Sequence, residues 1–275
     1  MGRRWERPWT RAVISAVALG AVAALPGCGA SSPAGAPRPA PAHSTASRAP
    51  GMPRATVTTP RAATGIAVSG DHPVSPSGSQ DTNAQAAGVS CDQGTFAADQ
   101  GIGARVATGF AGAGFPASAA LLTHFLRGTG TAAGYRAGSA ISKQAQASPA
   151  FRTVDSQVQA EILGQLKAGR TRIRLSAGQL PTVAFESGDG DLYWGFRGTQ
   201  GLTVTGSIHR EHGRYTGTLT YVIRDSYGFP AGDTLAGFGA PMRYLQTACG
   251  APQQAGGAHW FPDTITVTVP FSQPG

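Results

Sequence analysis

The side chains best suited to acid–base chemistry stand together in Asp225-Ser-Tyr-Gly-Phe229. Asp225 and Tyr227 close a long segment of period-two alternation, where side chains can emerge from a rigid sheet into a loop. A carboxylate placed there can accept and return a proton. We therefore take Asp225 and Tyr227 as the candidate catalytic residues. In the alternative interpretation, Asp225 caps a turn while Tyr227 and Phe229 pack beneath the sheet.

A second candidate site is the row of Arg170, Arg172 and Arg174. Alternate residues of a strand share one face and lie ~6.6–7 Å apart. Three guanidinium groups at that spacing could bind an anionic polymer or phospholipid headgroups, because each presents a fork of donors. The alternative is that the row is the ordinary solvent face of a strand.

The strand that ends in Asp225 and Tyr227 resembles the catalytic end of colicin M-type enzymes. Those enzymes are β-rich domains that cleave the lipid-linked precursor of the cell wall. The resemblance implies a cell-envelope-directed hydrolase that uses Asp225 and Tyr227. It covers about five of the 275 residues. Gly228 stands where the family has a second catalytic Asp, and the His209-Arg210 pair lies before the motif rather than after it.

The common catalytic and metal-binding motifs are missing from the sequence. It contains no Gly-x-Ser-x-Gly, His-Glu-x-x-His, Walker-type loop or Cys-x-x-Cys. His209 and His212 have only Glu211 beside them as a further ligand, whereas zinc requires three or four. We expect no cofactor and no metal.

The first 28 residues have the layout of a secretory signal. Arg3, Arg4, Arg7 and Arg11 precede an apolar run, Ala12 to Leu25, that is too short for the roughly 20 residues of a spanning helix. Leu25-Pro26-Gly27-Cys28 resembles the lipobox of bacterial lipoproteins. This resemblance implies cleavage after residue 27, lipidation of Cys28, and a protein anchored at the outer face of the cell membrane. The alternative is an ordinary cleaved signal peptide and a soluble secreted protein.

Residues 28–88 are expected to form a disordered tether that follows the lipidated cysteine. Ala, Pro, Gly, Ser and Thr fill 44 of the 60 positions from 29 to 88, and no Leu, Phe, Tyr or Trp occurs among them. Such a segment buries too little apolar surface to offset its conformational entropy. It would hold the folded part away from the membrane; the alternative is a low-complexity insert without a function.

The net charge argues against a nucleic-acid partner. The chain carries a formal charge of +8, but residues 89–275 contain 14 Lys and Arg against 11 Asp and Glu. That balance is too weak and too dispersed to attract a phosphate backbone. The partners we expect are the membrane, through the lipid anchor, and a cell-wall or envelope polymer.

Two cysteines remain for the folded part once Cys28 is assigned to lipid. Cys91 and Cys249 of an exported domain are expected to form a disulfide, and a catalytic thiol is the alternative. They bracket one domain, 89–275, of sufficient size for a hydrophobic core.

Hydrophobic periodicity divides that domain into a helical part, 89–169, and a β part, 170–275. Helices are predicted at 116–127, 139–147 and 149–168, and residues 95–112 are either helix or loop. Strands are predicted at 170–175, 181–186, 192–197 and 264–269, and 202–209 and 214–227 are predicted to form a hairpin in which Gly206 faces Gly217. This order predicts an α+β fold, with N-terminal helices followed by a curved antiparallel sheet or partial barrel.

The sequence favours a non-enzymatic surface lipoprotein, an envelope binding or structural module, over an enzyme. The first alternative is the envelope-directed hydrolase that uses Asp225 and Tyr227. The second is a toxin-like or immunity-like secreted protein.

Overall fold

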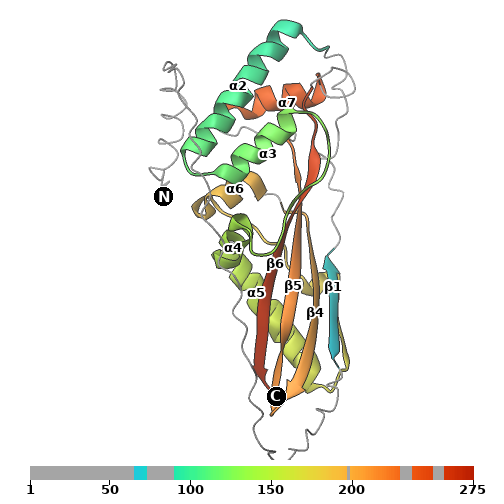
Figure 1. Cartoon of the computed structure of the whole chain (residues 1–275). Helices are drawn as coiled ribbons and strands as arrows, with labels where there is room; N and C mark the ends of the chain where they lie inside the picture. The colour runs from blue at the N-terminus through green and yellow to red at the C-terminus, as the bar shows by residue number, and fades with distance from the viewer. Residues whose placement is uncertain (1–64, 73–89, 197–198, 230–236, 250–256) are drawn as a thin grey trace, which may run out of the picture. The chain divides into compact units, whose positions relative to one another are not determined.

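A six-stranded open sheet with helices packed against it confirms the α+β class (Figure 1). The computed structural model describes residues 65–72, 90–196, 199–229, 237–249 and 257–275. The strand order is β2-β6-β5-β4-β1-β3. The strands are β1 (Ile66–His72), β2 (Ala133–Tyr135), β3 (Arg172–Leu175), β4 (Gly201–Glu211), β5 (Arg214–Tyr227) and β6 (Phe261–Pro274).

The sheet is mixed rather than purely antiparallel. Neighbouring strands from β6 through β5 and β4 to β1 run antiparallel. The two edge strands, β2 and β3, each run parallel to their neighbours β6 and β1. Parallel neighbours need a crossover connection, and in both pairs a long stretch of chain with several helices lies between the two strands.

The β4–β5 hairpin turns at His212 and Gly213, which have φ values of 50° and 75°. Two residues with positive φ form the tight turn that suits the twist of a hairpin. The predicted hairpin is confirmed, but its predicted register is wrong: Gly206 faces Leu219, and Gly217 faces Ile208. The predicted arms leave four residues, 210–213, for the turn, but the observed turn has only two. The strand pairing therefore shifts by two residues, and each side chain stays on the side of the sheet that the prediction gave it. A Cβ at Gly217 would collide with the carbonyl of Ser207.

The predicted helices are confirmed, and the Ala- and Gly-rich segment 95–112 is helical. The side chains of Asp92, Ser139 and Ser148 cap the helices that follow them, and Pro116 and Pro149 start theirs. The six helices of the described residues are α2 (Gln93–Gly112), α3 (Pro116–Leu126), α4 (Ala140–Ala147), α5 (Pro149–Lys167), α6 (Asp191–Phe196) and α7 (Gly239–Thr247).

Two predicted strands do not form. Pro181–Glu186 contains no strand, and 192–197 is replaced by α6. Tyr, Trp and Phe favour strands intrinsically, but this preference depends on packing. Leu192 and Phe196, four residues apart on one face of a helix, are both fully buried. Tertiary packing therefore decides the conformation.

The division into N-terminal helices and later strands is also wrong in detail. β1 lies inside the stretch predicted to be disordered, and it pairs with β3 on one side and β4 on the other. Ile66 and Val68 alternate with polar or small residues, but the composition of 60 residues conceals a strand of seven. The rest of 28–88 lies outside the described residues.

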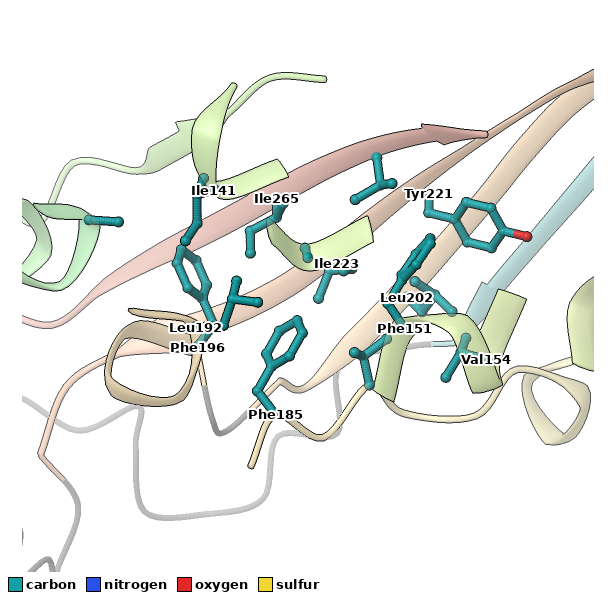
Figure 2. Packing of buried hydrophobic residues seen from close by; sticks show 14 of the residues in the cluster. Ile141, Phe151, Val154, Phe185, Leu192, Phe196, Leu202, Tyr221, Ile223 and Ile265 are labelled. Atoms are coloured by element: carbon teal, nitrogen blue, oxygen red, sulfur yellow. The ribbon is translucent and has the colours of Figure 1, made fainter. Parts of the chain in front are cut away.

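The inner face of the sheet carries the core. In β5 and β6 the odd-numbered residues are mostly buried, and those at even positions are more exposed. Figure 2 shows Ile141 of α4, Phe151 of α5 and Phe196 of α6 packed over the strand residues Tyr221, Ile223 and Ile265. We call the opposite side of the sheet the outer face; it points away from this core.

The predicted disulfide joins Cys91 and Cys249, whose Cα atoms are 4.8 Å apart. It links the start of α2 to the end of α7, and these helices also pack on each other. The Tyr244 hydroxyl accepts a hydrogen bond from the Asp92 amide at 2.7 Å, beside the disulfide. The segment before α2 is thus held to α7 and its C-terminal end by a disulfide and by a hydrogen bond.

Candidate functional site

Two carboxyl groups lie side by side on the inner face of the sheet. Asp225 of β5 faces Asp263 of β6 directly in the antiparallel register. Their exposed fractions are 7% and 0%. The next inner-face residues along the two strands are Ile223 and Ile265, which Figure 2 shows within the apolar core. The pair therefore lies where alternation would place apolar side chains.

Asp263 resists ionisation in this setting. Burial raises its pKa well above the ordinary value, and the negative charge of Asp225 raises it further. Neither carboxyl oxygen of Asp263 has a hydrogen-bond partner among the described residues. Two adjacent carboxylates cannot both ionise cheaply, so the pair favours a state with one proton.

Tyr135 of β2 stands next to this pair. β2 runs beside β6, with Ala133 facing Asp263 and Tyr135 facing Ile265. Burial raises the pKa of Tyr135 to about 12, and the charges of Asp263 and Asp191 contribute. The half-buried phenol therefore keeps its proton near neutral pH and remains a hydrogen-bond donor. Its ring packs edge-on against Phe196 at 5.6 Å.

Asp191, the third carboxylate nearby, has a structural task. It accepts hydrogen bonds from the amides of Ala117 and Ser118 at 2.8 and 2.7 Å, and from the Ser118 hydroxyl. Those amides belong to the first turn of α3, whose own N-cap residue, Phe115, makes no side-chain cap. Asp191 therefore caps α3 from a distant part of the chain.

Tyr227 lies among aromatic rings rather than in a loop. Its ring stacks on Phe261 at 5.5 Å and contacts the edges of Phe125 and Phe229. The alternative interpretation, in which Tyr227 and Phe229 pack beneath the sheet, is confirmed for both side chains. Asp225 itself lies within β5 and not in a turn.

Sequence reasoning identified one carboxylate of the pair and missed the other. The alternation recognised at 264–269 continues one residue toward the N-terminus and places Asp263 on the apolar face. A charged residue at an apolar position was the available signal. Tyr135 gave no such signal, because β2 has only three residues and is defined by its partner strand.

The three arginines do not form one row. Arg172 and Arg174 lie in β3 and face Ala67 and Ser69 on the outer face of the sheet. Arg170 precedes the strand, although its side chain is exposed like theirs. The arginines lie across the sheet from the carboxyl pair, so the two candidate sites are separate surfaces.

Some of the expectations concern residues that the structure does not describe, and others concern a membrane or a metal ion. The signal segment 1–27 and the lipidation site Cys28 are outside them, and in the described part no helix has the length and hydropathy to cross a membrane. Within the same residues, no cluster of three or more His, Cys, Asp or Glu side chains could hold a metal ion.

Comparisons with family models, with curated proteins and with solved structures found no match to the chain.

Proposed function

We propose that this protein is an exported, lipid-anchored hydrolase of the cell envelope that works by acid–base catalysis. The observation that carries the proposal is the Asp225–Asp263 pair on the inner face of the sheet. A buried carboxyl with unsatisfied oxygens is costly to folding. Such groups cluster at functional sites, where perturbed pKa values serve proton transfer.

The two carboxyls of the pair have different roles in this proposal. Asp225 is the more exposed, so it is the residue that would contact substrate. As a carboxylate, it would take a proton from a water molecule while the water oxygen bonds to the substrate. Asp263 acts through Asp225 as a positioning residue, since its retained proton lets its partner carry the charge. The Tyr135 hydroxyl would donate a hydrogen bond to the substrate oxygen that gains charge as the scissile bond breaks.

Two further features support the location and the substrate. The arginine-led apolar segment that ends in Cys28 supports export and a lipid anchor, and the chain beyond it supplies a spacer. The resemblance of Asp225 and Tyr227 to colicin M-type enzymes favours the lipid-linked cell-wall precursor as the first substrate to test.

The first prediction concerns Asp225. The purified chain should release a soluble product from the lipid-linked cell-wall precursor, and Asp225→Asn should reduce the rate at least about 100-fold, the usual contribution of a positioned acid or base. Chromatography of the soluble fraction measures the release. The control is Glu211→Gln, which removes an exposed carboxylate from the hairpin tip.

An Asp225→Asn protein that folds and keeps its rate would overturn the proposal, as would a wild-type chain inactive on both this precursor and isolated cell walls. Asp263→Asn should shift the pH profile of the rate, because the two side chains could then no longer share a proton.

A non-enzymatic envelope binding module is the second candidate function. Its supporting observation is the exposed, polar outer face of the sheet, which is built entirely apart from the carboxyl pair. The two functions separate cleanly, because Asp225→Asn removes catalysis and leaves the outer face intact.

A further inference from the structure

The outer face of the sheet is an array of hydroxyl groups. One row of facing residues crosses five strands as Thr268, Thr220, Thr205, Ser69 and Arg174. At a strand spacing of about 4.8 Å, this row extends for about 19 Å. The rows beside it place Thr218 next to Ser207, and Thr266 across from Val222. The side chains of this face are exposed or half-buried.

Positive charge gathers at the β3 edge of this array. Arg172 and Arg174 are exposed and form no ion pair with another described residue. The two carboxylates of the face have arginine neighbours of their own: Asp71 pairs with Arg224, and Glu211 lies opposite Arg214. On the described strand positions of this face, each carboxylate has another arginine as its neighbour, so the net positive charge lies at Arg172 and Arg174.

The side chains present limit the kind of partner. A hydroxyl both donates and accepts, so Ser and Thr rows match the hydroxyls of a sugar chain. The described strand positions of this face hold no Phe, Tyr or Trp. The face therefore lacks the aromatic side chains that insert into a membrane interface or form the core of a protein interface. Guanidinium forks suit carboxylate or phosphate groups.

We propose that the outer face binds an extended anionic polysaccharide, with its sugar hydroxyls on the Thr and Ser rows and its acidic groups on Arg172 and Arg174. This inference is independent of the proposed catalysis, because Asp225 and Asp263 point to the other side of the sheet.

The test compares four probes on the full chain. Polygalacturonate is anionic and hydroxylated, dextran is hydroxylated and neutral, polyglutamate is anionic without sugar, and phosphatidylglycerol vesicles offer an anionic membrane. We expect polygalacturonate to bind at least about tenfold more tightly than the other three, and to weaken as salt is added. Affinity electrophoresis measures the polymers and co-flotation the vesicles. For co-flotation, the Cys28→Ser chain is used so that a lipid anchor cannot attach it.

Two sets of variants test the residues. The Arg172→Gln/Arg174→Gln chain should lose at least about tenfold in affinity for polygalacturonate, whereas Arg105→Gln/Arg152→Gln, an equal loss of exposed charge on helices, should not. Thr205→Val/Thr220→Val removes two hydroxyls while retaining shape and strand preference, and should weaken binding about threefold or more.

Three results would each overturn the inference. If polyglutamate binds as tightly as polygalacturonate, and Thr205→Val/Thr220→Val does not weaken binding, the face recognises charge alone. Tighter binding of the vesicles would indicate a surface that binds membranes. If polygalacturonate does not bind, the face is not a site for anionic polysaccharides. Asp225→Asn should bind as the wild type does, so failure here is distinct from failure of the hydrolase proposal.

Discussion

Asp263 makes stability depend on pH in an unusual direction. Burial and the charge of Asp225 raise its pKa in the folded protein, while the unfolded chain titrates near the ordinary 3.8. Above that pH the unfolded state loses a proton that the folded state retains. Stability is therefore full below the unfolded pKa and is lost as pH rises toward the folded pKa. Asp99, whose pKa is also raised by burial, adds an effect of the same sign.

The prediction is a falling free energy of unfolding as pH rises from about 4, by up to about 1.4 kcal/mol per pH unit for one proton. Asp263→Asn should flatten that slope, because its amide cannot ionise. Urea unfolding at several pH values measures both chains. A wild-type slope of zero or of opposite sign, or an unchanged slope in the variant, would show that Asp263 is not the group responsible.

At the scale of elements, β1 is the strand that the sequence concealed. It forms seven residue pairs with β4 and four with β3, so it lies inside the sheet rather than at its edge. Without β1, the apolar side chains of β3 and β4 would lose their neighbour Val68, and β3 would lose its partner strand. The described sheet therefore includes a strand that precedes the predicted boundary at residue 89.

Two truncated chains test this boundary. A chain of 65–275 should retain a cooperative thermal transition, whereas a chain of 89–275 should melt at a temperature lower by several degrees or fail to fold. Circular dichroism on heating distinguishes them. If both melt alike, β1 contributes nothing to the stability of the sheet.

Local patterns predicted those elements that carry their own signals. The α5 stripe of Phe151, Val158 and Ile162, with Ser148 as cap, defines a helix without reference to the remaining chain. Alternation likewise predicts the two arms of the hairpin, but not their register, which the two-residue turn at His212 and Gly213 sets. The features that the sequence concealed depend on partners far away in the chain. α6 is helical because the fold buries Leu192 and Phe196, and β1 is a strand because it pairs with strands over 100 residues away. Asp225 and Asp263 are neighbours because of the register between β5 and β6.

At the scale of the whole described molecule, one disulfide joins segments near the two ends of the helical and β parts. Cys91 and Cys249 are separated by 158 positions, so their bond restricts the unfolded chain over most of the folded region. A loop of that length corresponds to about 5 kcal/mol in the chain-entropy model, and measured losses are typically about 2–5 kcal/mol.

Replacing both cysteines by Ala should therefore lower the free energy of unfolding by about 2–5 kcal/mol. Denaturant titration of the oxidised wild type and the double variant measures the difference. The reduced wild type is the matched control, and it should resemble the variant. A variant as stable as the oxidised protein would assign the disulfide no part in stability.

The place of β1 also decides how the molecule would respond to mechanical force. A pull on the chain before Ile66 reaches the described sheet through β1, and the part of the force directed along the strand loads β1 lengthwise. Sheet hydrogen bonds run across the strands, so a lengthwise pull shears the bonds to β3 and β4 together instead of opening them one at a time. Under the proposed lipid anchor, tension directed along β1 would therefore be carried by two strand ladders at once, and would be resisted better than a pull that peels a strand from one end.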